Sequence, residues 1–281
     1  MNLKNYLNYI YMVYAYGYKQ KIITNLSTIN ESTNNFYNYK GLNFLSKLNS
    51  KNKNIVFFFH ASIGYITGGV NRVIFKGYDY NIDNTDIICV SDYLINKYQE
   101  YILNWTLSTE KYNAEYIYKE LFTYIINLKK YSNIVFTGTS AGGFPSLKFA
   151  CMFNCIALIA NSQIYLEEYG KDTGNGFHHL KNMVENNNDK LIYVNKQIES
   201  IINKYKPKKI IIYNNKKDST YKRDIIPFIK YIEDSNISNL FEINIFDYDG
   251  IIPNGRTQHH IYFPDNKGNL YILNEFLKKN I

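Results

Sequence analysis

The sequence predicts an α/β fold in which a mostly parallel central sheet is covered by helices on both faces. Short apolar, β-prone runs alternate with amphipathic stretches through most of the chain. One of these runs leads through a glycine-rich turn directly into a helical pattern at residues 133–153. The chain has 281 residues, 46% of them hydrophobic and 20% charged, so it can bury a large core. We expect a single domain over residues 1–281.

The expected elements follow in order after residue 50. Apolar runs predict strands, and stretches with apolar residues at helical spacing predict helices. The expected strands are 54–60, 86–90, 133–137, 155–160, 209–213 and 241–248. The expected helices are 114–128, 141–153, 191–204, 225–233 and 269–279. A segment rich in turn residues, 161–190, predicts a loop-rich, cap-like insertion after the strand that follows the glycine-rich turn.

The first 50 residues carry a weaker pattern. We expect strands at 10–18 and 21–26 and a short helix near 42–48. The aromatic stretch at 6–18 is too short to span a bilayer and lacks a small-residue cleavage site. We therefore expect a cytoplasmic protein without stable membrane insertion.

The turn at residues 138–142 has the pattern Gly-Thr-Ser-Ala-Gly and lies between a strand and a helix. This is typical of a nucleophile elbow, in which glycines permit the tight backbone and Ser140 is presented above the sheet. Pro145 falls in the first turn of the helix, where a missing N–H is tolerated. The alternatives are an ordinary glycine-rich turn or a phosphate-binding loop, but neither G-x-x-x-x-G-K-[ST] nor G-x-G-x-x-G occurs here.

A serine nucleophile needs a base, and the base needs an acidic partner. Asp218 follows the expected strand 209–213 and is the candidate acid, with Asp224 and Asp249 as substitutes. Asp218 could instead cap the turn before the next helix. His260 is the candidate base, with its neighbour His259 as the alternative, because both lie in the loop between the last strand and the last helix.

Backbone N–H groups are expected to stabilise the negative charge that develops on the substrate oxygen. One is that of Ala141, directly after the serine, and the second is that of Ala61 or Ser62, in the loop after strand 54–60. His60 ends that strand and would face the site, although a strand-end histidine is more often a packing residue.

The remaining histidines and the cysteines predict no metal site. His178 and His179 are adjacent and have no suitably spaced third ligand, so we expect loop residues near the substrate entrance. The three cysteines lie in apolar surroundings and are expected to be buried free thiols, which favours a reducing compartment.

The net charge is +8 and the isoelectric point is near 9.0, yet the lysines are spread along the whole chain. Nucleic-acid binders usually gather their cations on one face or tail, so no nucleic-acid partner is expected. The positive charge favours an acidic substrate without identifying it.

The order Ser140, Asp218, His260 resembles that of the α/β-hydrolase superfamily, over roughly residues 50–281. Several short motifs are similar to those of a branch of serine esterases and O-acetyltransferases associated with bacterial capsule and surface-polysaccharide biosynthesis. They are Val90-Ser-Asp92, Leu103-Asn-Trp105, Gly143-Phe144 and Asn161-Ser-Gln163.

The resemblance implies an acyl-enzyme on Ser140 that passes its acyl group to water or to a sugar hydroxyl. It implies a small-molecule or polysaccharide substrate and, for a transferase, acetyl-CoA as acyl donor, with no bound cofactor. The candidate substrate-binding residues are Asn104, Trp105, Gln163 and His60. Trp105 could form a stacking floor for a sugar or be a core aromatic. The competing hypothesis is a non-catalytic glycan-binding or scaffolding protein. Whether the chain forms a homo-oligomer is left open.

Overall fold

The computed structural model describes residues 20–61, 75, 77, 79–98, 105–170, 176–251, 257–258 and 269–279. Its centre is a nine-stranded sheet in the order β1-β2-β3-β5-β4-β7-β8-β10-β11. The strands are β1 (Gln20–Ile23), β2 (Asn34–Tyr39), β3 (Leu42–Lys47), β4 (Asn54–Phe59), β5 (Thr85–Val90), β7 (Asn133–Thr139), β8 (Ile156–Ala160), β10 (Lys209–Asn215) and β11 (Phe241–Phe246). All neighbours are parallel except β2–β3 and β3–β5. The predicted α/β class with a mostly parallel sheet is confirmed.

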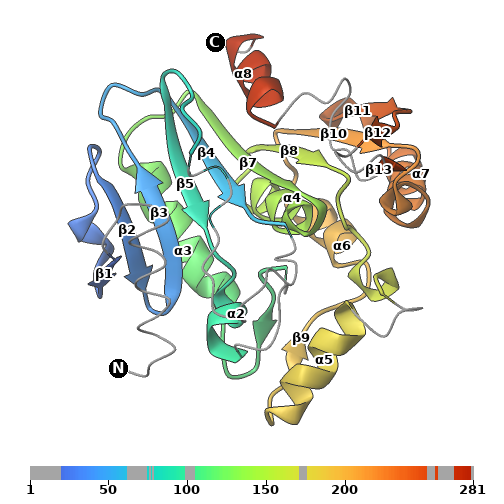
Figure 1. Ribbon diagram of the computed structural model, residues 1–281, viewed down its shortest axis with the longest axis horizontal. Coiled ribbons are helices and arrows are strands. Elements are labelled where there is room, and N and C mark those ends of the chain that lie inside the picture. Colours follow the sequence, from blue (N-terminus) through green and yellow to red (C-terminus); the bar gives the residue numbers. More distant parts are fainter. Residues whose placement is uncertain are drawn as a thin grey trace.

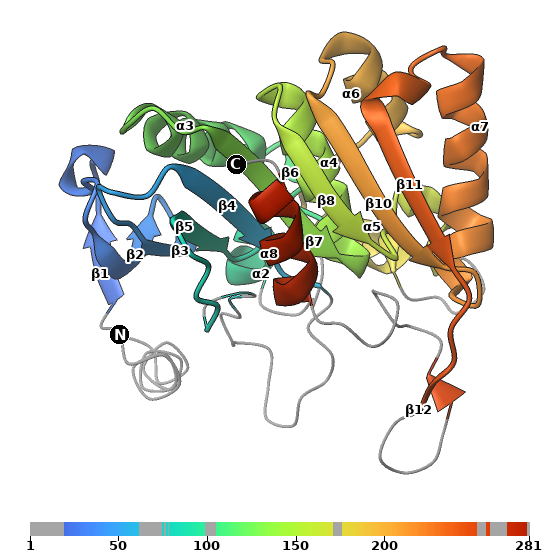
Figure 2. The ribbon, with the colours of Figure 1, turned by 90° about the horizontal axis from the view of Figure 1, so that it is seen from above.

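Helices lie on both faces of the sheet (Figures 1 and 2). One face carries α3 (Ala114–Asn127), α4 (Gly143–Met152), α6 (Gln197–Lys204) and α7 (Ile226–Asp234), and α8 (Asn269–Lys279) lies on the other. The remaining described elements are α2 (Tyr93–Tyr98), α5 (Phe177–Asn186) and the two-stranded pairs β6 (Ser108–Thr109) with β9 (Leu191–Ile192) and β12 (Gly250–Ile251) with β13 (Thr257–Gln258). Five short helical turns are Leu26–Thr28, Ser140–Gly142, Leu166–Glu168, Tyr221–Ile225 and Ser238–Leu240.

Strand β4 shows why the sheet needs helices on both sides. Its six residues are all buried, and successive side chains point to opposite faces. Phe57 and Phe59 pack in the core under the α3 and α4 layer, whereas Val56 and Phe58 pack in the core that includes α8. A continuous apolar run is therefore required at this central position.

The expected helix at 42–48 is wrong: Leu42–Lys47 is strand β3. It pairs antiparallel with both β2 and β5 and places Phe44 and Leu45 in opposite cores. Long-range pairing outweighs the local pattern here. The expected strand at 21–26 ends at Ile23, because Asn25 caps the following helical turn by accepting a hydrogen bond from the Ser27 N–H. The expected strand at 10–18 lies outside the described residues.

The segment 161–190 is less loop-rich than expected, because it contains α5. Phe177, Leu180, Met183 and Val184 are buried at helical spacing, a pattern that predicts a short amphipathic helix. His178 and His179 therefore lie on a helix and not in a loop. The helix expected at 191–204 begins only at Gln197, after β9.

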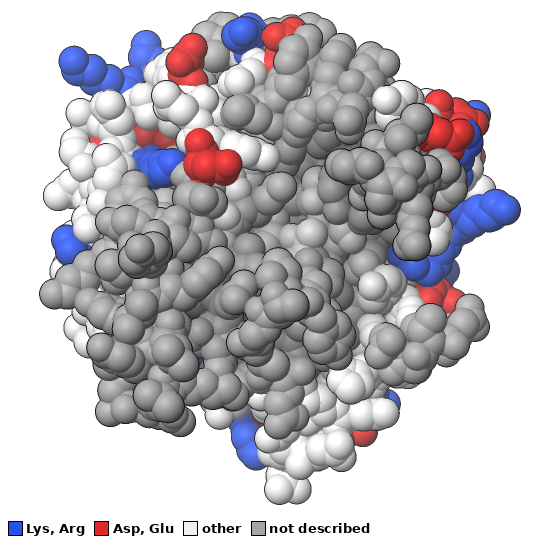
Figure 3. Space-filling view, in the orientation of Figure 1, with Lys and Arg blue, Asp and Glu red and all other residues white. Residues whose placement is uncertain are grey.

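The described surface carries mixed charge. On the face seen in Figure 3, described lysine and arginine side chains lie beside aspartate and glutamate side chains around the rim.

Among the described residues, no helix is long and apolar enough to cross a membrane. The three cysteines are buried and free, as predicted, and burial raises the pKa of the Cys151 thiol to about 12.

Candidate active site

Ser140 stands at a sharp turn between strand β7 and helix α4. Its φ is +53°, a left-handed conformation that costs a non-glycine residue roughly 1–2 kcal/mol. The chain passes from β7 through the helical turn Ser140–Gly142 into α4 without an intervening loop. Such strain in a tight turn at the carboxyl edge of a parallel sheet is the geometry expected of a nucleophile elbow.

The glycines around Ser140 are required by close backbone contacts. A Cβ added to Gly138 would lie 2.3 Å from the carbonyl oxygen of Gly142. A Cβ on Gly142 would lie 2.7 Å from the carbonyl oxygen of Phe59 and 2.8 Å from that of His60. Backbone atoms cannot rotate away as side chains can, so the elbow packs directly on itself and on the end of β4.

Gly143, the first residue of α4, fits against Ser162. An added Cβ would lie 1.9 Å from Ser162 Oγ and 2.3 Å from Ser162 Cβ. We expect Gly143→Ala to destabilise the fold by about 3 kcal/mol or more, because overlap at this distance exceeds the roughly 1 kcal/mol that alanine gains over glycine in a helix. Chemical denaturation monitored by circular dichroism measures the difference.

The double variant Gly143→Ala/Ser162→Gly is the matched control, since it removes both colliding atoms. Ser162 Oγ is buried and has no hydrogen-bond partner among the described residues, so its loss costs little. We expect the double variant to be clearly more stable than Gly143→Ala alone. Additive effects of the two substitutions would show that this contact does not determine the residue at 143.

Gln163 contacts Ser140 through both its side chain and its backbone. Its Nε2 donates to Ser140 Oγ over 3.4 Å, and its backbone N–H donates to the Ser140 carbonyl oxygen over 3.1 Å. Its Oε1 accepts a hydrogen bond from Trp105 Nε1 at 2.6 Å. The structure thus brings together three of the residues named from the sequence.

Trp105 is 1% exposed and packs edge-on against Tyr169, with ring centroids 5.8 Å apart. This placement favours the core-aromatic alternative over a stacking floor for a sugar.

Asp218 follows β10, at the same edge of the sheet as Ser140. Its Oδ1 accepts hydrogen bonds from the Thr220 N–H at 2.8 Å and from Thr220 Oγ1 at 2.6 Å. Its Oδ2 accepts one from Asn161 Nδ2 at 3.3 Å, and Asn161 Oδ1 in turn accepts one from the Asn215 N–H at 2.9 Å. Asp218 is 5% exposed, so these hydrogen bonds fix the position of a buried carboxyl group.

The two substitutes for the acid lie in other surroundings. Asp224 is fully buried and accepts hydrogen bonds from the N–H groups of Ile164 and Tyr165, at 2.7 and 2.9 Å, and pairs with Arg223. Asp249 is half-exposed and forms an ion pair with Lys217. Asp224 therefore holds the backbone just after Gln163, and Asp249 stands at the surface.

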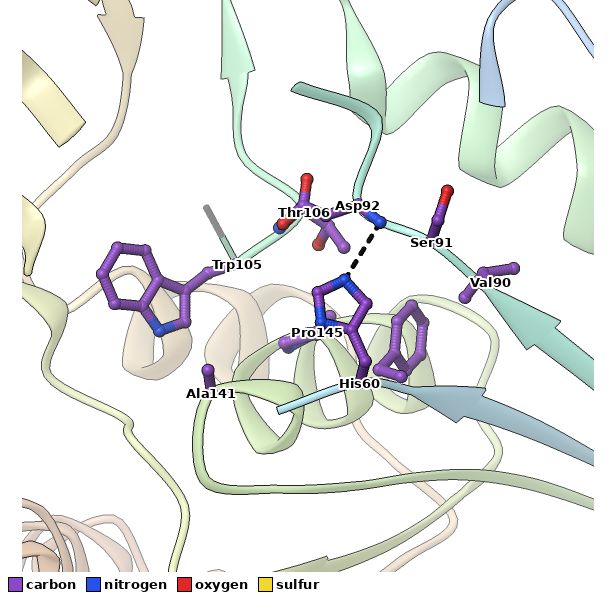
Figure 4. Close-up of a pocket in the computed structure, with 9 residues that line it drawn as sticks. His60, Val90, Ser91, Asp92, Trp105, Thr106, Ala141 and Pro145 are labelled. Atoms are coloured by element: carbon purple, nitrogen blue, oxygen red, sulfur yellow. Dashed lines mark hydrogen bonds between the residues drawn. The ribbon is translucent and has the colours of Figure 1, made fainter. Parts of the chain in front are cut away.

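His60 lines a small cavity between the end of β4, the end of β5 and the start of α4 (Figure 4). The cavity is about 10 Å³, roughly enough for one water molecule. The other lining residues are Phe59, Val90, Ser91, Asp92, Trp105, Thr106, Ala141 and Pro145.

The hydrogen bonds of the His60 ring define its charge state. Nε2 accepts from the Asp92 N–H at 3.2 Å, so Nδ1 carries the proton and donates to the Ala61 carbonyl oxygen at 2.6 Å. Burial lowers the pKa of His60 and keeps it neutral. The His60 ring thus links the end of β4 to the segment after β5 and to Ala61, and both of its nitrogens have backbone partners.

Four of the predicted site residues, Ser62, Asn104, His259 and His260, lie outside the described residues. Ala141 is buried within the elbow. The carbonyl oxygen of Ala61 accepts the hydrogen bond from His60 Nδ1. Within the described ranges, no group of three or more His, Cys, Asp or Glu side chains could hold a metal ion.

Asn161 contacts Asp218, and no individual role was expected for it from the sequence. Asn161 directly follows β8, the strand next to the elbow strand. Because the carboxyl ends of parallel strands meet at one edge of the sheet, this position could have indicated that Asn161 lies near the site.

No protein-family model matches the chain, and no curated protein sequence matches it. Solved structures do resemble it. The capsule O-acetyltransferase of Neisseria meningitidis serogroup A has a TM-score of 0.55 at 16% identity, over 91% of this chain and 98% of that one. A fluorophosphonate-binding serine hydrolase of Staphylococcus aureus has a TM-score of 0.50 at 12% identity, over 88% and 95%.

A ferulic acid esterase has a TM-score of 0.51 at 9% identity, over 85% of this chain and 93% of that one. At such low identities the likeness concerns the fold alone. Together with the strand order and the turn at Ser140, it shows that this chain has the α/β-hydrolase fold.

Proposed function

We propose that this protein is a serine-dependent acyl-transfer enzyme that acts on carbohydrate esters, as an esterase or as a polysaccharide O-acetyltransferase. The observation that carries the proposal is Ser140, held at φ +53° on a glycine-lined turn, with an amide donor at its hydroxyl. A buried serine held in a strained, glycine-lined turn between a strand and a helix is typical of a nucleophile. The fold shared with an O-acetyltransferase, a serine hydrolase and an esterase supports the same chemistry.

In the proposed reaction, Ser140 Oγ attacks the carbonyl carbon of the ester while its proton passes to an imidazole, for which His260 is our candidate and His259 the alternative. Asp218 orients that imidazole and stabilises its protonated form. The N–H groups of Ala141 and of Ala61 or Ser62 stabilise the charged carbonyl oxygen of the tetrahedral intermediate. The intermediate expels the alcohol, which takes the proton back, and leaves an acyl group on Ser140.

Water or a sugar hydroxyl then attacks the acyl group on Ser140. The imidazole accepts the proton of the attacking group and returns it to Ser140 Oγ as the acyl group is released. The outcome depends on whether the site excludes water and positions the acceptor, and the proposed triad residues are the same in both cases. Acetyl-CoA is the proposed donor if the enzyme is a transferase. The capsule O-acetyltransferase among the structural neighbours favours an acetyl group and a polysaccharide acceptor.

The test first detects the acyl-enzyme and then identifies the molecule that accepts its acyl group. Brief incubation with a chromogenic acetyl ester, followed by intact-protein mass spectrometry and peptide mapping, should find one acetyl group on Ser140. Adding acetyl-CoA with a panel of capsule-type oligosaccharides should give acetylated sugar for a transferase, or free acetate for an esterase acting on acetylated sugars. Acetylation at another residue would refute Ser140 as the nucleophile. No acetylation together with tight glycan binding would favour the non-catalytic alternative.

A further inference from the structure

Gln163 lies immediately beside the proposed nucleophile and is almost inaccessible to solvent. It belongs to the segment that follows β8 and is 3% exposed. Its side-chain amide bridges the indole nitrogen of Trp105, at 2.6 Å, and the hydroxyl oxygen of Ser140, at 3.4 Å. The residues it joins are distant in sequence, since 58 positions separate it from Trp105 and 23 from Ser140.

The chemistry of the indole determines which end of the amide faces Ser140. An indole N–H can only donate a hydrogen bond, so the group opposite it must be the amide oxygen. The two ends of a glutamine amide are nearly the same in shape, so the partners decide its orientation. Trp105 therefore directs the NH₂ group of Gln163 toward Ser140 Oγ.

This orientation assigns the roles in the contact with the serine. An amide NH₂ group donates hydrogen bonds and does not accept them, so Ser140 Oγ must be the acceptor. The hydroxyl hydrogen of Ser140 is then left for a base. A glutamine with the opposite orientation would accept that hydrogen and hold it away from the base.

The contact should strengthen as the reaction proceeds. When the base removes the proton, negative charge develops on Oγ, and a hydrogen bond to an ionised acceptor is about twice as strong as one between neutral groups. Burial increases the effect, because water does not screen the charge. An interaction that is stronger in the transition state than in the ground state raises kcat.

We propose that Gln163 is a catalytic residue that donates a hydrogen bond to Ser140 Oγ during deprotonation, and that Trp105 is the positioning residue that holds Gln163 in this orientation. The proposal rests on the proposed function, since it requires Ser140 to be the nucleophile. It replaces the expected substrate-binding role of both residues with a role at the reacting oxygen.

The first test uses the second-order rate of Ser140 labelling by a fluorophosphonate, together with kcat and KM for a small acetyl ester. Gln163→Ala should lower the labelling rate and kcat by roughly 10- to 100-fold, the range expected for loss of a hydrogen bond to a charged group, with little change in KM. A raised KM with unchanged kcat would overturn the proposal in favour of substrate binding.

Gln163→Glu provides a pH signature that a structural role would not. An ionised carboxylate at this position would accept the serine hydrogen and oppose charge on Oγ, whereas a protonated carboxyl could donate. We therefore expect the labelling rate of Gln163→Glu, relative to wild type, to rise as the pH falls through the pKa of the introduced carboxyl. A ratio that does not change with pH would contradict the assignment.

Trp105→Phe tests the positioning role, because it keeps an aromatic ring and removes the N–H. It should lower the labelling rate, and the double variant with Gln163→Ala should be no slower than Gln163→Ala alone. Tyr169→Phe is the matched control, since it alters the ring packed against Trp105 and leaves the indole N–H in place. Equal rates for Trp105→Phe and wild type would overturn the positioning role.

Thermal denaturation of each variant separates loss of fold from loss of rate. Failure of wild-type protein to label at Ser140 would refute the proposed function itself. Normal wild-type labelling that is unaffected by the Gln163 variants would refute only this inference.

Discussion

Replacing Ser140 with alanine will abolish covalent labelling by a fluorophosphonate and reduce ester turnover by about 10⁵- to 10⁶-fold, the size of loss seen when a serine nucleophile is removed. The physical reason is that the substitution removes Oγ, the atom on which the proposed acyl intermediate forms. What remains is the much smaller rate enhancement from oriented backbone donors. Gel-based labelling and steady-state kinetics measure the two effects.

The fold should survive this substitution. Alanine can adopt the left-handed conformation at residue 140 at a cost similar to that of serine. Among the described residues it removes only the side-chain hydrogen bond from Gln163, so the melting temperature should change little. Ser162→Ala is the matched control, because Ser162 is also buried near the elbow and its hydroxyl has no hydrogen-bond partner among the described residues. We expect it to label at the wild-type rate. Persistent labelling of Ser140→Ala would refute the assignment of the nucleophile.

The second large effect is expected for Asp218→Asn, which should lower kcat about 10⁴-fold, as is typical when the acid of such a triad becomes an amide. The asparagine cannot stabilise a protonated imidazole, and its NH₂ group would favour the wrong tautomer of the base. Steady-state kinetics with the chromogenic acetyl ester measure the loss.

Asp218→Asn should also lower the stability of the folded protein. Both oxygens of Asp218 accept hydrogen bonds, from Thr220 on one side and from Asn161 on the other, so an asparagine must place its NH₂ group against a donor. We expect a loss of roughly 1–3 kcal/mol in the free energy of unfolding, the usual cost of an unsatisfied buried polar group. Chemical denaturation measures it alongside the kinetics.

Asp249→Asn is the control for the acid, since Asp249 is half-exposed and pairs with Lys217 at the surface. It should leave kcat unchanged within a factor of about two, because surface ion pairs contribute little. If Asp249→Asn removed activity while Asp218→Asn retained it, the acid would have to be reassigned.

Much of the central sheet could be predicted because its strands are locally distinctive. The run at β4 is apolar at almost every position, and the run at β7 leads straight into a glycine-rich turn, so both strands and the elbow follow from neighbouring residues. Strand β3 could not be predicted in this way. Its identity depends on antiparallel pairing with β2 and β5, and such pairing leaves no local signature.

The candidate site also combines features that local sequence predicts with contacts that depend on tertiary packing. The role proposed for Ser140 follows from residue types at fixed spacing, and the acid was expected from its position after a strand. The supporting contacts of Asn161, Gln163 and Trp105 come from segments far apart in the chain. Whether the indole of Trp105 meets a sugar or a glutamine depends on how those segments pack, and the structure places it in the core.

The sequence by itself determined the α/β class, the turn that holds Ser140 and the candidate identities of its partners, because strand, turn and helix propensities act between residues close in the chain. Only the tertiary structure decided that Gln163 faces Ser140 with its NH₂ group, that Asn161 contacts Asp218 and that His60 accepts a hydrogen bond from the Asp92 N–H. These properties depend on hydrogen-bond partners brought together by the parallel sheet, whose strand order no short stretch of sequence encodes.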